Sequence, residues 1–290
     1  MRRLAFALAL SLAAPLATAP RAQVREGALP RPSPNAALAQ TVGVTDVTVT
    51  YGRPAARGRV VFGAAGSGAL VPYGEVWRTG ANEATTITFS TDVTVEGRPL
   101  AAGTYGLFTV PGAEAWEVVF NRVPNQWGAY AYDAGQDALR VTVRPEAVGA
   151  EELFTITADA VSESEATLAL RWAGVRVPVR VGVDAAAAVR ARAEAEVAQA
   201  TDFRVPLRYA SWSAQTGQLV PEANGWADRA VALEANYQTL AAQARLRAAA
   251  GRYAEAAQAG ERALAMGRGM AEAPRGLAEL EAELAGWRER

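Results

Sequence analysis

The hydrophobic period of this chain changes once, near Val183, and that change constrains the fold more than any other feature. Before it, from about residue 42, apolar and polar side chains alternate in short runs that turn residues separate, a pattern typical of β-strands. After it, the chain is rich in alanine and its apolar side chains recur at helical spacing. The sequence therefore predicts a β-rich part followed by an α-helical part.

The β-rich part contains many short strands and no helical segment between them. We expect a first strand from Val42 to Tyr51, with a bulge near Asp46. Ala173-Gly174 is expected to join the last two strands as a tight hairpin. The remaining strands are expected near residues 59–62, 84–96, 104–110, 115–121, 138–144, 151–159, 165–172 and 174–181. This succession is typical of an antiparallel sandwich or barrel, and we assign residues 40–182 to an antiparallel β-sandwich.

The helical part, residues 183–290, contains a weak internal repeat. Asp184 is expected to cap a helix that runs to about Ala200. Beyond it, Gly217-Gln-Leu-Val-Pro-Glu222 and Gly251-Arg-Tyr-Ala-Glu-Ala256 lie 34 residues apart, and the second segment resembles a tetratricopeptide repeat. Trp226 is expected to fill the groove between the helices of the first repeat.

A terminal helix over about residues 273–288 would cap the repeats. Two repeats and a cap are fewer than a free-standing array usually needs. We therefore expect the helices to pack on the sandwich or on another chain, through an apolar face that can dock a peptide or protein partner. The predicted fold class is α+β multidomain: an antiparallel β-sandwich followed by an α-helical tetratricopeptide-like array.

The N-terminus has the pattern of a secretory signal peptide over residues 1–22. Arg2 and Arg3 precede an apolar run from Leu4 to Ala14, and Ala17-Thr-Ala19 forms a cleavage site. Pro20 disfavours cleavage directly after that site, so we place it from Ala19 to Ala22. The apolar run is shorter than the roughly 20 residues that span a bilayer, so the sequence predicts an exported, periplasmic or extracellular protein without a membrane span. Residues 23–39 are expected to be a flexible, proline-containing lead-in.

The residue types that are missing exclude several chemistries. All 29 basic side chains are arginine, and the chain has no histidine and no cysteine. A Ser-His-Asp or Cys-His nucleophile, an ordinary zinc or copper site, a P-loop lysine and a Schiff base are therefore excluded. The formal net charge of −1 gives no reason to expect a nucleic-acid partner. We expect no cofactor and no metal.

The densest group of polar side chains is Trp77-Arg-Thr-Gly-Ala-Asn-Glu83, directly before a predicted strand. Such a group forms either a binding site or an internally satisfied polar cluster. As a binding site, Arg78 would hold a carboxylate or another polar ligand, while Asn82 and Glu83 bond hydroxyl groups. As a structural cluster, Arg78 would pair with Glu83, and Asn82 would bond its own backbone.

Aromatic side chains extend the candidate site. Tyr130 and Tyr132 would share one face of a strand, and aromatic rings there could stack on sugars, although aromatic residues in a sandwich more often belong to the core. We expect Trp116 and Trp172 to be core residues. Arg57 joins the polar constellation. The candidate ligand-binding residues are Tyr51, Arg53, Tyr73, Arg78, Asn82, Glu83, Tyr105 and Trp127.

Two classes of function remain open. A hydrolase of envelope or extracellular glycans would use Glu83 as acid or base and needs a second carboxyl group facing it, from Glu75, Asp92 or Asp133. A calcium site near Asp133 and Asp137 lacks the usual loop spacing. Since no catalytic constellation is recognisable, the sequence favours a cell-envelope binding or scaffold module, with a polar cleft on the sandwich and a helical docking tail, over an enzyme.

Three longer segments resemble one known family. They are Val49-Thr-Tyr-Gly-Arg-Pro54, residues 70–83 and residues 100–108, and the similarity continues at Asn121, Gln126-Trp-Gly128, Tyr130, Tyr132 and Asp133. Over Ser33 to Val181 the chain is similar to the domain-of-unknown-function family numbered 2911, which occurs in exported bacterial proteins, some with a trailing tetratricopeptide-like segment. The resemblance implies export and the two-part architecture, and it implies no chemistry.

Overall fold

The computed structural model describes residues 29–290, which divide into two compact units. The first comprises the chain up to Val42 with residues 46–161 and 166–182, and the second comprises residues 43–45, 162–165 and 183–290. The predicted signal peptide and the first residues of the lead-in lie outside the described residues. No helix within residues 29–290 combines the length and apolar character that crossing a membrane requires.

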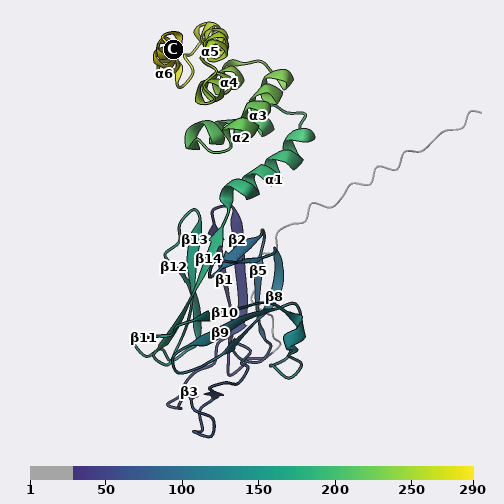
Figure 1. The fold of residues 1–290 in the computed structure, drawn as a ribbon, viewed down its shortest axis with the longest axis vertical. Coiled ribbons are helices and arrows are strands. Elements are labelled where there is room, and N and C mark those ends of the chain that lie inside the picture. Colours follow the sequence, from purple (N-terminus) through teal and green to yellow (C-terminus); the bar gives the residue numbers. More distant parts are fainter. Residues whose placement is uncertain (1–28) are drawn as a thin grey trace, which may run out of the picture. The chain divides into compact units, whose positions relative to one another are not determined.

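The first unit is a sandwich of two six-stranded sheets (Figure 1). One sheet has the order β1 (Asn35–Val42), β2 (Thr45–Gly52), β5 (Thr85–Phe89), β8 (Gly103–Val110), β9 (Trp116–Asn121) and β10 (Asp137–Val143). The other has the order β12 (Thr155–Asp159), β13 (Glu165–Trp172), β14 (Val175–Val183), β6 (Val93–Val95) and β7 (Arg98–Leu100), and β11 (Glu146–Ala147) pairs with β14. A parallel pair, β3 (Phe62–Gly63) and β4 (Val71–Pro72), and a 3₁₀ turn, Ala134–Gln136, complete the unit.

Alternating side chains of the two sheets meet in one apolar core. Ile87 of β5 and Val49 of β2 face Ile156 of β12 and Leu168 of β13, and all four are buried. At one place the core is aromatic: the Trp77 and Trp172 rings stack at a centroid distance of 5.7 Å. The burial of Trp116 and Trp172 confirms that both belong to the core. The period-two pattern of the sequence therefore corresponds to burial between two sheets.

The strand boundaries differ from expectation at the N-terminal edge. The strand expected from Val42 to Tyr51 is β2, which begins at Thr45, because Gly43 adopts a left-handed φ of 58° and turns the chain between β1 and β2. β1 begins at Asn35, so the lead-in is shorter than residues 23–39. The expected strand at 84–96 is two strands, β5 and β6. The Ala173-Gly174 hairpin is confirmed, with φ angles of 47° and 85° that suit a tight turn between β13 and β14.

The second unit contains six helices within residues 183–290: α1 (Ala185–Ala198), α2 (Arg204–Thr216), α3 (Val220–Leu233), α4 (Tyr237–Ala249), α5 (Tyr253–Arg268) and α6 (Leu277–Arg288). The Asp184 side chain caps α1 by accepting a hydrogen bond from the Ala187 amide at 2.9 Å, as predicted. Gly217 and Gly251 have φ angles of 71° and 75° and lie in the turns after α2 and α4. The 34-residue spacing therefore reflects two helix pairs, α2 with α3 and α4 with α5.

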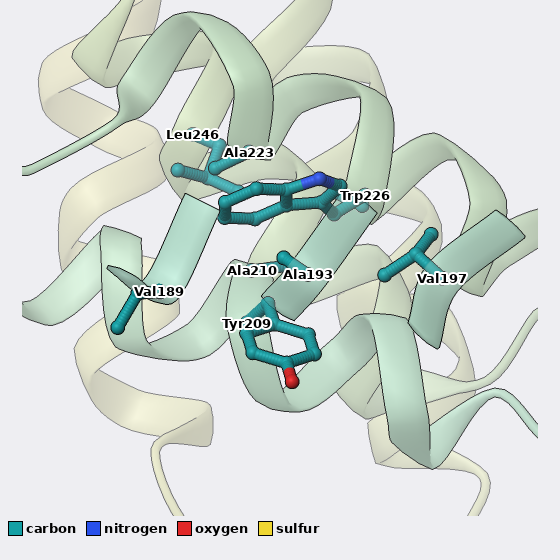
Figure 2. Packing of buried hydrophobic residues seen from close by; sticks show 9 residues of the cluster. Val189, Ala193, Val197, Tyr209, Ala210, Ala223, Trp226 and Leu246 are labelled. Atoms are coloured by element: carbon teal, nitrogen blue, oxygen red, sulfur yellow. The ribbon is translucent and has the colours of Figure 1, made fainter. Parts of the chain in front are cut away.

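Trp226 organises the core of the first four helices. Its indole packs with Val189 and Ala193 of α1, Tyr209 of α2 and Leu246 of α4, and Figure 2 shows the ring at the centre of this cluster. Because Ala193, Ala210, Ala223 and Ala227 are fully buried around it, the helices approach closely enough to enclose the large ring. The sequence-based expectation that Trp226 fills a groove between helices is confirmed.

Candidate functional site

A tight turn of the sandwich unit positions Arg78. The turn begins at Trp77, whose backbone N–H donates to the Thr109 carbonyl at 2.7 Å and whose indole N–H donates to the Gly80 carbonyl at 3.0 Å. Gly80 has a φ of 153°, and a Cβ there would lie 2.9 Å from the Gly52 carbonyl oxygen. The turn therefore packs directly against the end of β2, which fixes the backbone of Arg78.

Arg78 carries a charge that no group in the described part of the chain compensates. Its side chain is half-buried, its Nε is inaccessible to solvent and has no hydrogen-bond partner, and within residues 29–290 it forms no ion pair. Burial lowers the pKa of Arg78, and the nearby Tyr130 hydroxyl acts in the opposite direction. A desolvated cation without a counter-ion is costly. Arg78 is thus the group in this stretch best suited to a negatively charged ligand.

Glu83 has a different partner from the one that the sequence suggested. Arg31 Nη1 lies 2.9 Å from Oε1 and 2.8 Å from Oε2 of Glu83, and the two side chains are 29% and 28% exposed. The Arg78–Glu83 pair, which the structural alternative required, is therefore wrong. Sequence reasoning missed Arg31 because it lies 52 residues upstream in the proline-containing lead-in, and no local spacing relates the two positions.

The lead-in lies against the same polar stretch. Asn82 Nδ2 donates to the Ser33 carbonyl at 3.4 Å, and Arg57 Nη2 donates to the Pro32 carbonyl at 3.3 Å. The Arg53 amide donates to the Pro34 carbonyl at 2.8 Å. The expectation that Asn82 bonds its own backbone is wrong for its side-chain amide, which reaches the lead-in instead. Asn82, Arg57 and Arg53 therefore bind the lead-in of the chain itself, at residues 32–34.

Three other candidates have structural roles. The Arg53 side chain donates from Nε to the Phe154 carbonyl at 3.0 Å and from Nη2 to Thr155 Oγ1 at 2.7 Å, which ties it to β12. The buried Tyr51 hydroxyl accepts the Ile156 amide at 3.1 Å. The buried Tyr105 hydroxyl donates to the Ala101 carbonyl at 2.8 Å, and burial raises its pKa. Their contacts hold the sandwich together.

Tyr73 occupies a different place, at the edge of the small parallel sheet. It directly follows β4 and is half-buried, and its amide donates to the Gly63 carbonyl at 2.8 Å. Its backbone therefore extends the pairing of β4 with β3.

The exposed aromatic residues lie on a loop that runs beside residues 82–84. Trp127 is 60% exposed and Tyr130 is 88% exposed. Trp127 forms an antiparallel bridge with Glu83, and the Gly128 amide donates to the Asn82 carbonyl at 2.9 Å. A Cβ on Gly128 would lie 2.8 Å from the Tyr130 ring, so glycine gives that ring room. The loop thus presents two accessible rings at the strand that follows Arg78.

Tyr130 and Tyr132 do not share one face of a strand, contrary to the expectation, because residues 128–131 form a turn. The Tyr132 hydroxyl donates to Asp137 Oδ2 at 2.7 Å and accepts from Arg140 Nη2 at 2.7 Å. Burial, followed by the bond to Asp137, raises the pKa of Tyr132 to about 12. Tyr132 and Asp137 are therefore parts of a structural network.

Two further carboxylates considered for hydrolysis serve local turns. Asp92 Oδ1 accepts the Ala102 amide at 2.8 Å, and Asp133 Oδ1 accepts the Gly135 amide at 2.9 Å. Both are ordinary backbone-capping contacts. These contacts give no support to a pair of catalytic carboxyl groups.

Comparison with known proteins agrees with the resemblance in the sequence. The family model described as "Protein of unknown function (DUF2911)" matches residues 33–181, just over half of the 290-residue chain. The matched range contains Arg78, Glu83, Trp127 and Tyr130, and it ends before α1. Neither a curated protein nor a solved structure matches the chain.

Proposed function

The chain belongs to the DUF2911 family of proteins of unknown function, and we propose, from the properties of its own residues, that it is a binding protein of the cell envelope. In this proposal the sandwich binds a small acidic ligand that contains a ring, and the helical unit docks a partner. The charge of Arg78, which lacks a counter-ion within residues 29–290, is the observation that carries the proposal.

The ligand class follows from the groups around Arg78. A carboxylate or phosphate would supply the missing counter-ion and accept two parallel N–H bonds from a guanidinium. Trp127 and Tyr130 offer exposed faces on which a flat or sugar ring can stack. A sugar acid, such as a uronic acid unit of a glycan, combines both features. We therefore propose an acidic saccharide as the ligand of the sandwich unit.

Glucuronate is a suitable probe, with glucose as its neutral counterpart. Isothermal titration with the full mature chain should detect glucuronate more readily than glucose. Arg78→Gln should weaken glucuronate binding at least tenfold, which corresponds to about 1.4 kcal/mol. Arg144→Gln is a matched control, because Arg144 is also an arginine of the sandwich unit and is exposed. Equal binding of glucose and glucuronate, or no effect of Arg78→Gln, would contradict the proposal.

Export is the second part of the proposal. The leader pattern of residues 1–22 supports it, and an envelope location would give the protein access to acidic glycans. Expression of the whole chain in a Gram-negative host, followed by intact-mass measurement of the periplasmic fraction and the medium, tests this. Cleavage between Ala19 and Ala22 is the expected result. A full-length chain confined to the cytoplasm would refute it.

The alternative is a carboxylate-dependent hydrolase of glycans that uses Glu83. It has less support, because both carboxylate oxygens of Glu83 already accept bonds from Arg31, which occupies the position that a substrate proton would need. Turnover of an envelope glycan that disappears in Glu83→Gln, with the fold intact, would establish the hydrolase and refute a purely binding role.

A further inference from the structure

The last residues of the lead-in, Leu29 to Pro34, lie against the turn that contains Asn82 and Glu83 and form a strap over it. Arg31 Nη1 lies 2.9 and 2.8 Å from the two carboxylate oxygens of Glu83. The Ser33 carbonyl accepts a hydrogen bond from Asn82 Nδ2 at 3.4 Å. The two side chains that the sequence proposed for ligand hydroxyl groups are therefore engaged by the chain itself.

The strap has little apolar attachment to the sandwich. Every second residue from Pro30 is a proline, and these prolines are exposed. Arg31 and Ser33 between them are half-buried, and Leu29 is 79% exposed. Because no side chain of the strap is buried, docking it removes little apolar surface from water. The strap is therefore held mainly by polar contacts.

Several of these polar contacts are weak. The bond from Arg57 Nη2 to the Pro32 carbonyl is 3.3 Å long, close to the limit for a hydrogen bond. The Arg31–Glu83 pair is partly exposed, so water screens part of its attraction. Proline has no N–H group, so the strap cannot pair as a regular β-strand. It can thus leave the turn without breaking β1, which begins at Asn35.

We propose that the strap is a displaceable cover of the sandwich ligand site, and that it competes with the hydroxyl groups of the acidic saccharide for Asn82 and Glu83. The inference rests on the proposed function and adds the regulation of that site. Trp127 and Tyr130 are 60% and 88% exposed while the strap is docked. A saccharide therefore reaches both rings in the closed state, and reaches Asn82 and Glu83 only when the strap is released.

The strap should lower the apparent affinity for the ligand. A ligand that needs Asn82 and Glu83 binds only the fraction of molecules in which the strap is released. Its apparent Kd then exceeds the intrinsic Kd by the reciprocal of that fraction. A substitution that weakens the closed state, at a residue that does not touch the ligand, should consequently tighten binding.

Arg31→Gln tests this in the full mature chain, by isothermal titration with glucuronate. The variant should bind glucuronate about threefold to fivefold more tightly than the parent, because a partly exposed ion pair of the closed state is lost. Loss of a positive charge would by itself weaken the attraction for an acidic ligand. Tighter binding therefore separates release of the strap from a general charge effect. Arg144→Gln removes the same charge at an exposed position and should not tighten binding.

The Arg53 amide reports the position of the strap directly, because it donates to the Pro34 carbonyl at 2.8 Å. Its hydrogen exchange, followed by NMR, should be faster in Arg31→Gln than in the parent. Saturating glucuronate should also accelerate it in the parent, whereas a ligand that only rigidified the site would slow it. The Ile156 amide, which donates to the buried Tyr51 hydroxyl, is the internal control and should not change.

The opposite results overturn the inference. Unchanged or weaker glucuronate binding by Arg31→Gln, with native circular dichroism, would show that the strap does not compete with the ligand. Slower exchange of the Arg53 amide on binding would show that the strap stays docked. Absence of binding by parent and variant alike would refute the ligand site and the strap's role with it, whereas equal binding by both would refute the strap alone.

Discussion

The contact between Arg31 and Glu83 connects the lead-in to the turn that carries Arg78. Both side chains are just over a quarter exposed, so their attraction is screened less than that of a surface pair. Glu83 also belongs to the strand segment that pairs with Trp127. Loosening this pair should therefore disturb the order of the lead-in before it affects the core.

A double-mutant cycle of Arg31→Ala and Glu83→Gln measures that pair. We expect a coupling energy of about 1 kcal/mol in urea unfolding, because a partly buried pair lies between the exposed and buried cases. The same cycle on Arg204 and Asp202, an exposed pair, is the control and should give a smaller coupling. Equal coupling energies in the two cycles would contradict the role of burial.

Sequence reasoning identified the residues of the candidate site better than their partners. The density of polar side chains identifies the polar stretch, whereas the sequence does not decide whether Trp127 is exposed. The pairing of Glu83 did not follow from the sequence, since its partner Arg31 lies in a segment without hydrophobic pattern, and only the fold brings the two together. The sequence also could not predict that the charge of Arg78 lacks a counter-ion, because that depends on which groups the fold buries around it.

At the scale of elements, glycines decide where backbone segments touch. A Cβ on Gly52, at the end of β2, would lie 2.3 Å from the Ala81 carbonyl oxygen, so the turn would have to move. Gly225, in the exposed middle of α3, has nothing within 4 Å of an added Cβ. The same substitution should therefore have opposite effects at the two positions.

Gly52→Ala should lower the free energy of unfolding by about 2–3 kcal/mol through overpacking. Gly225→Ala should raise it by about 0.5–1 kcal/mol, because alanine restricts the unfolded chain and favours the helix. Denaturant unfolding of both variants beside the parent measures the two effects. A destabilised Gly225→Ala variant would contradict the open space at Gly225, and a neutral Gly52→Ala variant would contradict the close contact between Gly52 and Ala81.

Asp159, at the end of β12, links three neighbouring strands of the second sheet. It accepts bonds from Arg171 of β13 at 2.9 Å and from Arg176 of β14 at 3.0 Å. Burial alone would raise the pKa of Asp159, but the two arginines and Thr157 together lower it below its ordinary value of 3.8. A lowered pKa stabilises the folded state above the ordinary value, and that contribution disappears as the pH falls through the folded-state pKa.

Asp159→Asn should therefore destabilise the chain at pH 7 by about 1 kcal/mol, since the site is partly exposed. The difference from the parent should shrink as the pH is lowered below 3.8, the ordinary value for this carboxyl. Urea unfolding at a series of pH values measures this, with the exposed Glu289→Gln as the charge control. A difference that is independent of pH would exclude an electrostatic origin.

The elements themselves followed largely from the sequence, because hydrophobic period and turn residues are local signals. Ala173-Gly174 predicted a hairpin correctly, since two left-handed residues define that turn. Gly43 carries the same kind of signal, but Val42 and Val44 beside it continue the alternation of the following residues, so the turn resembles the start of that strand. β3 and β4 have two residues each, which is too short to show a hydrophobic period in the sequence, and their pairing depends on the tertiary structure.

At the scale of the whole molecule, each unit has a large aromatic side chain at the centre of its own core. Trp172 stacks with Trp77 between the sheets, and Trp226 packs among the first four helices. Neither side chain belongs to the core of the other unit. Removing one of them should leave a cavity in one unit only.

Trp226→Ala should destabilise the helical unit by about 3–5 kcal/mol, the usual cost of truncating a buried tryptophan to alanine. Native-state hydrogen exchange should then show faster exchange in α1 to α4, while the strands around Trp172 keep the protection of the parent. Trp172→Ala should give the reverse pattern. If either variant accelerated exchange equally in both units, the two cores would unfold as one cooperative structure, and the division into two units would describe geometry alone.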